Sequence, residues 1–96
     1  MFVSFRKYDG CKDTAALNRR VQDTLVSKVK AMKGFRSYTV VDLGGGSVAS
    51  ISVFDTRADA EAANASVRGL VQQSLLDLVP NPPTVMVGEV LSETRA

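Results

Sequence analysis

The chain has 96 residues, of which 45% are hydrophobic and 23% charged, and its net charge is +2. This composition is typical of one globular domain, which we expect over residues 1–96 with an ordered part at about 2–91. No apolar run approaches the roughly 20 residues that cross a bilayer. No basic and apolar leader precedes the first predicted strand. We therefore expect a cytoplasmic protein without a membrane partner.

Cysteine and histidine usage narrows the chemistry further. Cys11 is the only cysteine, so an intrachain disulfide or a cysteine metal cluster is excluded. The chain has no histidine to activate a thiolate, and Cys11 is not expected to be catalytic. Residues 1–48 hold nine Lys or Arg and four Asp or Glu, and much of this positive charge lies on one predicted helix. That pattern favours a solvated helix face over a nucleic-acid footprint.

The first two elements are a strand and a helix. Residues 2–8 alternate between two faces, as a strand does. Asp13 is a good helix N-cap, and Gly34 follows the helix as a C-cap glycine. Between them, apolar residues recur at helical spacing and predict one continuous helix: Leu17, Val21, Leu25, Val29 and Met32.

A hairpin follows. Residues 35–43 and 48–54 are rich in β-branched and aromatic residues, and Gly44 to Gly46 separate them. Glycine takes the positive φ that a tight reversal needs, so the pattern predicts two antiparallel strands joined by a turn. A phosphate-binding loop is the alternative for three glycines. It requires a helix directly after them, and here a β-branched strand follows.

A second helix is predicted over about 57–78. Asp55 or Thr56 can cap its N-terminus, and Asp59 completes a pattern like a capping box. Gly69 within this helix suggests close packing against a neighbour. The prolines of residues 80–83 end the helix and lead into a last strand over 84–91.

The predicted order is therefore β-α-β-β-α-β. Right-handed crossovers around the hairpin give a four-stranded antiparallel sheet of order 4-1-3-2 with both helices on one face. The fold class is α+β, and the architecture is ferredoxin-like.

Alternation along the strands sorts their side chains into two sets. One set is almost wholly apolar and is assigned to the helix-covered core: Val3, Phe5, Ala49, Ile51, Val53, Met86, Gly88 and Val90. The other set contains apolar residues that an uncovered face would not need. It is expected to pack on a second copy of the chain, as a homodimer, through Phe2, Arg6, Tyr8, Phe54, Val85, Val87, Glu89 and Leu91. Arg6 and Glu89 are predicted to form an ion pair there.

These residues resemble a known family. Gly34-Phe35 opens a strand, Ile51-Ser52-Val53-Phe54 precedes an alanine-rich helix, and Gly88-Glu89-Val90 ends the sheet, as in the antibiotic biosynthesis monooxygenase-like proteins. The resemblance covers about residues 2–91 and implies a dimeric α+β barrel. Members of that family include cofactor-independent monooxygenases that oxidise polycyclic aromatic substrates, and haem-degrading enzymes.

The resemblance also implies a set of site residues. The haem-degrading branch uses Asn, Trp and His; this chain lacks Trp and His, so no haem, metal or other cofactor is expected. The quinone-forming branch orients its substrate with Tyr, Trp, Asn and Arg. The nearest equivalents here are Arg36 and Tyr38 on the second strand, and Asn64 and Arg68 on the second helix. Tyr38 and Asn64 are the catalytic candidates, and all four are candidates for ligand binding.

The sequence leaves the reaction open. A cofactor-independent monooxygenase-like enzyme for a small hydrophobic or aromatic substrate competes with a non-catalytic dimer that binds an apolar ligand or a protein partner. RNA-recognition motifs share the element order, but they expose aromatic residues on strands 1 and 3. Strand 3 here has one aromatic residue, at its end, so no nucleic-acid partner is expected. Metal-chaperone domains of this topology need Cys-x-x-Cys, which is absent.

Overall fold

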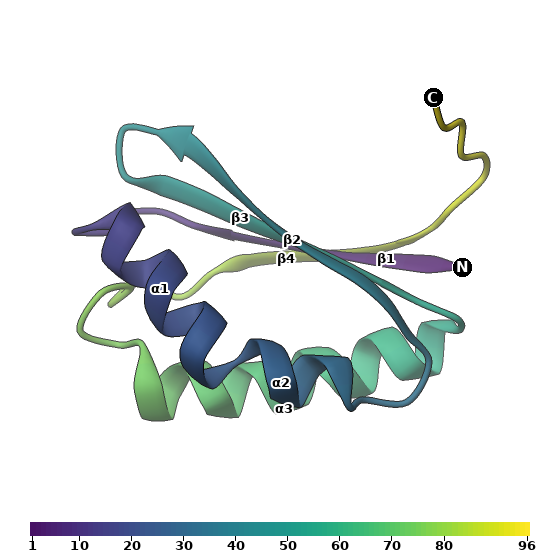
Figure 1. Cartoon of the computed structure of the whole chain (residues 1–96), viewed down its shortest axis with the longest axis horizontal. Coiled ribbons are helices and arrows are strands. Elements are labelled where there is room, and N and C mark those ends of the chain that lie inside the picture. Colours follow the sequence, from purple (N-terminus) through teal and green to yellow (C-terminus); the bar gives the residue numbers. More distant parts are fainter.

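A computed structural model describes residues 1–96 (Figure 1). Its elements in chain order are β1 (Phe2–Tyr8), α1 (Thr14–Thr24), α2 (Val26–Lys30), β2 (Phe35–Gly44), β3 (Ser47–Phe54), α3 (Arg57–Ser74) and β4 (Thr84–Glu89). The strands form one antiparallel sheet in the order β2-β3-β1-β4. This is the predicted ferredoxin-like topology, and the fold class is confirmed.

The first predicted helix is divided in two at Leu25. Asp13 caps α1 as expected, because its Oδ1 accepts from the Ala16 N–H at 3.0 Å. At the other end of α1, the Thr24 hydroxyl donates to the Arg20 carbonyl at 2.7 Å. Such back-bonding within a helix often bends it. The apolar spacing continues through the bend, which is why the sequence pattern predicted a single helix.

The hairpin and its glycine turn are confirmed. Gly44, Gly45 and Gly46 have φ values of 84°, 62° and 83°. This is the left-handed region that side chains with a Cβ rarely adopt. The Asp42 carboxylate accepts from the Gly44 N–H at 2.9 Å and so supports the reversal.

Helix α3 begins as predicted and ends earlier than predicted. The Thr56 hydroxyl accepts from the Asp59 N–H at 3.1 Å. The helix stops at Ser74, and turns lead through residues 75–78 to the prolines. The expected close packing at Gly69 is wrong, since a Cβ placed there would meet no atom within 4 Å. No helix of the structure is both long and apolar enough to pass through a bilayer.

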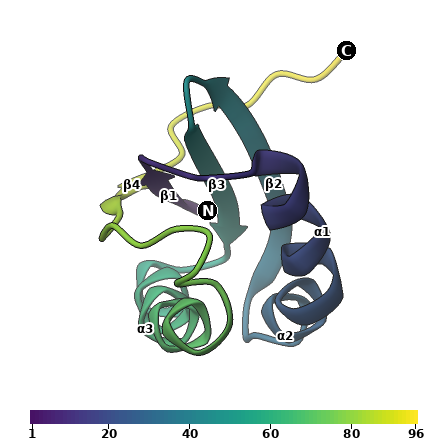
Figure 2. The same cartoon turned by 90° about the vertical axis from the view of Figure 1, so that its left-hand side faces the viewer.

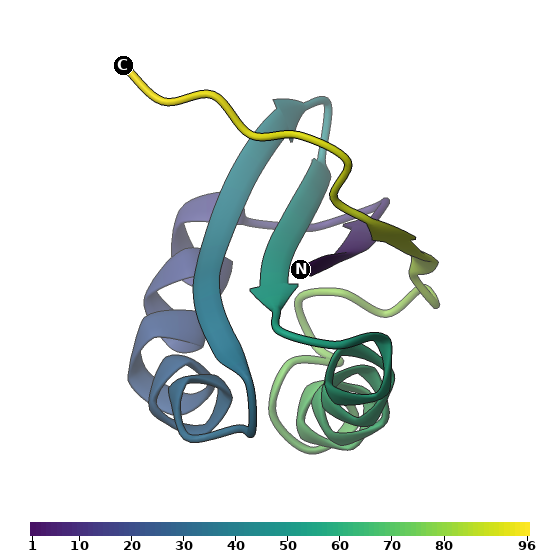
Figure 3. The ribbon, with the colours of Figure 1, turned by 90° about the vertical axis from the view of Figure 1, so that its right-hand side faces the viewer.

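All three helices lie on one side of the sheet, with α1 and α2 beside α3 (Figures 1 and 2). We call the sheet surface that they cover the covered face and the opposite surface the open face. The C-terminal segment leaves β4 on the side away from the helices (Figures 1 and 3). The main core lies between the helices and the covered face, and its largest fully buried side chain is Phe54.

The predicted assignment of the two faces is wrong: it is inverted. Ser4, Arg6 and Tyr8 on β1 are buried, and Ser4 bonds to Asn64 of α3, so this set faces the helices. Cross-strand register places Phe54, Ser52 and Ser50 on the same side. The prediction gave the core to the more apolar set. That rule failed because the polar groups of the covered face bond to one another and to α3.

The proposed interface residues are corrected accordingly. Phe2, Arg6, Tyr8, Phe54, Val85, Val87 and Glu89 belong to the covered face by register, and Leu91 lies beyond the end of β4. The predicted Arg6–Glu89 ion pair is also wrong. Glu89 is opposite Phe2, whereas Arg6 is opposite Val85 and bonds to Tyr8 and Asn64.

The open face is mainly apolar. Val3, Phe5, Ile51 and Val53 are half-buried on it, and Met86 is 56% exposed beside Phe5. The side chain of Leu91, in the segment that leaves this side of the sheet, is 91% exposed. The chain thus presents its most apolar strand surface to its outside.

Candidate functional site

A groove of about 450 Å³ opens along one edge of the helix–sheet interface. It lies between β1, the C-terminal half of α3, the proline segment and the start of β4. Its volume is within the range of small-molecule sites. The lining residues are Arg6, Tyr8, Arg68, Val71, Gln72, Leu76, Val79, Pro80, Asn81, Pro82, Pro83 and Val85.

Arg6 is the charged group at the base of this groove. Its side chain comes from the middle of β1 and points to the covered face, so the residue is only 4% exposed. Its Nε donates to the Tyr8 hydroxyl at 3.1 Å. One terminal nitrogen, Nη1, lies 3.5 Å from both the backbone carbonyl and the side-chain oxygen of Asn64. The guanidinium carbon is also 5.8 Å from the centre of the Tyr8 ring.

These partners leave part of the guanidinium unoccupied by protein. Arg6 forms no ion pair with any carboxylate of the chain. Its second terminal nitrogen, Nη2, has no hydrogen-bond partner in the protein. Every fully enclosed side-chain nitrogen of this structure does have a partner. Nη2 is therefore not fully enclosed, and Arg6 is one of the residues that line the groove. A buried cation without a counter-charge is costly unless something else neutralises it.

Asn64 fixes the position of this cation. It lies on α3, and its Oδ1 accepts from the Ser4 hydroxyl at 2.6 Å. Ser4 itself is 1% exposed. The single amide therefore links two adjacent inward-facing residues of β1 to the helix above them. This network orients Arg6 toward the groove and satisfies polar atoms that burial would otherwise penalise.

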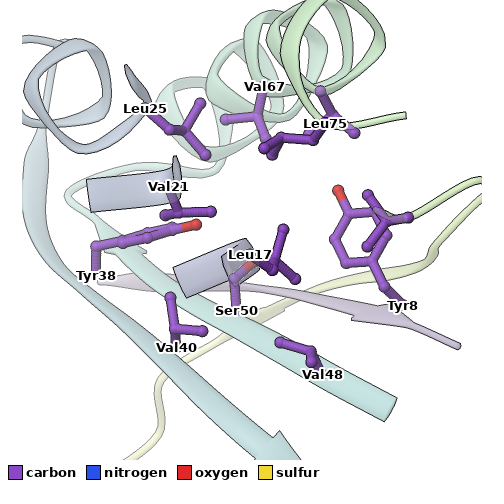
Figure 4. A pocket seen from close by; sticks show the side chains of 12 residues that line it. Tyr8, Leu17, Val21, Leu25, Tyr38, Val40, Val48, Ser50, Val67 and Leu75 are labelled. Atoms are coloured by element: carbon purple, nitrogen blue, oxygen red, sulfur yellow. The ribbon is translucent and has the colours of Figure 1, made fainter. Parts of the chain in front are cut away.

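An apolar cavity lies next to the groove, in the core between the helices and the sheet. Its volume of about 30 Å³ would hold roughly one water molecule. Tyr8 and Tyr38 stand on opposite sides of it, with Ser50 on the sheet between them (Figure 4). Tyr8, Val71 and Val79 line both spaces, so the cavity and the groove share a wall.

Tyr38 is a hydrogen-bond donor in this setting. Burial raises the pKa of its phenol above the usual value of 10.0, and the neighbouring Ser50 hydroxyl acts in the opposite direction by less. The hydroxyl therefore stays protonated throughout the physiological range. It can donate to an oxygen anion and is a poor general base.

The structure brings some predicted site residues together and leaves one out. Asn64 contacts Arg6, and Arg68 lines the groove one helical turn further along α3. Tyr38 lies in the adjoining cavity, on the side opposite Tyr8 (Figure 4). Arg36 lies elsewhere: it is exposed and forms an ion pair with Asp55. Arg36 therefore does not take part in this arrangement.

Sequence reasoning missed Arg6 and Tyr8 as site residues because it placed them on the opposite face. One signal in the sequence could have found them. An arginine and three serines in one inward-facing register of two central strands form a polar patch, and Asn64 is the helix amide that can bond to it. No group of three potential metal ligands occurs in the structure, and no carboxylate lines the groove.

No protein-family profile matches this sequence, and the comparison with curated proteins gives no match. Solved structures do match. One is a candidate antibiotic biosynthesis monooxygenase from Deinococcus radiodurans, with 16% identity over 100% of this chain and 98% of that chain and a TM-score of 0.74. Another is a dimeric ferredoxin-like protein from an uncultured marine organism, with 23% identity over 97% of both chains and a TM-score of 0.72.

A third match is the ActVA-Orf6 monooxygenase of Streptomyces coelicolor, whose structure contains nanaomycin D. It has 14% identity over 99% of this chain and 91% of that chain, and the TM-score is 0.68. At these identities the likeness establishes a fold. The chain has the ferredoxin-like α+β fold of the antibiotic biosynthesis monooxygenase-like proteins.

Proposed function

We propose that this protein is a cofactor-independent monooxygenase-like enzyme that acts on a small hydrophobic or aromatic substrate. The observation that carries the proposal is the groove between α3 and the sheet, where apolar walls surround a buried guanidinium with a free donor. Convergent polar groups in a mainly apolar pocket are typical of small-molecule sites. The fold shared with monooxygenases supports the same class of reaction.

The reaction must take its electrons from the substrate. A suitable substrate is a phenol whose ring carries an oxidisable methylene. Its phenolate form transfers electrons to O₂, the methylene becomes a carbonyl, and the second oxygen atom leaves as water. In total R₂CH₂ and O₂ give R₂C=O and H₂O, so no external reductant is consumed.

The residues at the site would stabilise negative charge. One of the two N–H groups of Arg6 Nη2 would donate to the anionic oxygen that develops on the substrate, and preorganised donors of this kind lower the barrier to charge development. Asn64 would hold Arg6 in place through the contacts described above. Tyr38 would donate a second hydrogen bond if the small cavity widens to admit the ring of the substrate.

Homodimerisation through the open face belongs to the same proposal. Val3, Phe5, Ile51 and Val53 form a continuous apolar strand surface that the single chain does not cover. Patches of this kind on globular proteins usually mark interaction surfaces. One solved neighbour of this fold is described as dimeric, which is consistent with this use of the sheet.

Oxygen consumption with a panel of phenolic tricyclic substrates tests the activity. The wild-type protein should consume O₂ and form a quinone without added cofactor, and Asn64→Ala should reduce turnover by roughly 10- to 100-fold, as expected for a displaced charge-stabilising donor. Tyr38→Phe should reduce turnover by less, with unchanged circular dichroism. Asn18→Ala, on an exposed part of α1, serves as the control.

A non-catalytic binding module is the second candidate. The groove contains no carboxylate or histidine, so the chain offers no general base beside Arg6 to deprotonate a ligand. The same panel separates the two functions. A binding module would retain a ligand in equilibrium dialysis while O₂ consumption stays at the rate without protein, and this result would overturn the catalytic proposal.

A further inference from the structure

We infer that the groove selects a ligand with an anionic carboxylate on an apolar aromatic body, and that Arg6 and Arg68 bind this carboxylate. The inference rests on the proposed function, because it names the chemical class of the molecule that the same groove takes. It adds a requirement that the phenol chemistry itself does not impose. The ligand must carry a formal negative charge away from the oxidised ring carbon.

The groove is positively charged. Two guanidinium groups line it, and none of its twelve lining residues is acidic. Arg6 has no ion pair, and Arg68 has none either. Most other arginines of the chain do pair: Arg20 with Asp77, Arg36 with Asp55, Arg57 with Glu61 and Arg95 with Glu93. The groove therefore holds positive charge that the protein leaves uncompensated.

The guanidinium of Arg6 is buried beneath the groove and held in place by hydrogen bonds. Three hydrogen bonds to Tyr8 and Asn64 hold Nε and Nη1 of Arg6, and the remaining nitrogen, Nη2, has no partner in the protein. Arg6 lines the groove. The N–H of Nη2 that the substrate oxyanion does not use can donate a charge-assisted hydrogen bond to a carboxylate oxygen. Arg68 is exposed on α3 and can supply a second donor at the mouth.

Apart from the two arginines, the wall of the groove is mainly apolar and preformed. Val71, Val79 and Leu76, together with the prolines of residues 80–83, give the groove an apolar side. Proline rings hold their backbone at a fixed φ, so this wall is preformed. Gln72 and Asn81 add neutral hydrogen-bonding groups at the edge. The combination fits an amphipathic aromatic acid, whereas a fully hydrated inorganic anion would leave the apolar wall unused.

Two matched probes test the inference by isothermal titration calorimetry. These are 2-naphthoate, which is anionic, and 2-naphthamide, which is a neutral molecule of nearly the same shape. The wild-type protein should bind the naphthoate at least about tenfold more tightly, as expected for a charge-assisted hydrogen bond at a desolvated site. Inorganic phosphate at an equal concentration should not displace it, because phosphate has no apolar body.

Variants connect that preference to the two arginines. Arg68→Gln should weaken naphthoate binding by about three- to tenfold and leave naphthamide binding unchanged, because Arg68 is a solvent-exposed charge at the rim. Arg6→Gln should remove the preference for the anion. Arg19→Gln, which deletes an exposed charge on α1 that does not line the groove, should change neither affinity.

The outcomes are distinguishable. Equal affinity for the two probes, displacement of the naphthoate by phosphate, or a preference that survives in both groove variants would overturn the anion site. Equal affinity would leave the proposed function standing. Failure of both probes to bind would contradict both. If Arg6→Gln fails to fold, which circular dichroism would show, the Arg68→Gln result decides.

Discussion

The two faces of the same sheet have opposite characters, and the difference is informative. The covered face holds Ser4, Arg6, Ser50 and Ser52, all buried beneath helices. The open face has Val3, Phe5, Ile51 and Val53 at the neighbouring positions of the same strands, and no element of the chain covers it. In an isolated domain the polar residues would be expected outside. The reversed pattern indicates that the two faces of the sheet have different roles.

Polar groups beneath helices are expensive to bury, so they are retained where they bind or position something. Apolar groups facing outward are unfavourable in water, so they are retained where another surface covers them. We therefore propose that the covered face binds the ligand and that the open face mediates self-association. The following predictions test this contrast between adjacent strand positions.

The largest effect is expected from a pair of neighbouring residues on β3. Phe54→Ala removes a side chain with 0% exposure that packs edge-on against Phe35 with a ring separation of 6.0 Å. The cost in unfolding free energy should be about 3–5 kcal/mol at any protein concentration. Val53→Ala, on the open face, should cost about 1–2 kcal/mol, and this cost should shrink on dilution because it acts through the dimer. Urea titrations at two protein concentrations measure the unfolding free energies of both variants. If the costs of the two substitutions depended equally on protein concentration, the proposed roles of the two faces would be contradicted.

A charge on the open face should prevent self-association. Ile51→Lys places an ammonium in the middle of the apolar surface, and burying it against a second copy would leave it unpaired. The dissociation constant should rise at least about 100-fold. Because the helix-side core is untouched, the monomer should stay folded. Light scattering coupled to size-exclusion chromatography gives the mass, and a variant that elutes like the wild type would argue against this face.

Removing the amide that links the helix to the sheet should have a smaller effect. Asn64→Ala takes the acceptor from the buried Ser4 hydroxyl and the side-chain contact from Arg6, whose contact with the backbone carbonyl of residue 64 remains. The loss of stability should be about 1–3 kcal/mol, the cost of leaving buried polar groups unsatisfied. Thermal unfolding measures it. Asn18→Ala on the exposed side of α1 should stay within about 0.5 kcal/mol of the wild type.

The smallest effect concerns a helix position around which a Cβ would meet no atom within 4 Å. Gly69→Ala should stabilise the protein by about 1 kcal/mol, since alanine is the better helix former and the added Cβ meets no atom within 4 Å. Gly45→Ala is the contrasting change. There φ is 62°, so the same methyl group should destabilise the turn. A destabilising Gly69→Ala would show that α3 packs on something outside the single chain.

Much of the fold could be predicted from the sequence because local signals agree with one another. The caps at Asp13 and Thr56, the three turn glycines and the prolines after α3 each mark an element boundary. The break at Leu25 could not be predicted, because the apolar spacing continues through it, and the Thr24 side chain bonds within its own helix there. Apolar periodicity does not report such a bond.

Alternation along the strands could not by itself predict which face of the sheet the helices cover. Alternation shows that two sets exist, but it does not show which set the helices cover. Here both sets contain large apolar side chains, and the deciding contacts are long-range, such as that from Ser4 to Asn64. The candidate site was therefore predicted in part. Asn64, Arg68 and Tyr38 lie on the helix-covered side at or beside the groove, while Arg6 and Tyr8 were missed as its central residues.

The most direct test of the whole account is the mass of the wild-type protein in solution. Sedimentation equilibrium at micromolar concentration should give a species of twice the 10.3 kDa chain mass, because the open face would be buried between two copies. The fitted mass should fall toward one chain on dilution. A single 10.3 kDa species throughout the micromolar range would contradict the account, since the apolar open face would then remain in water without a partner.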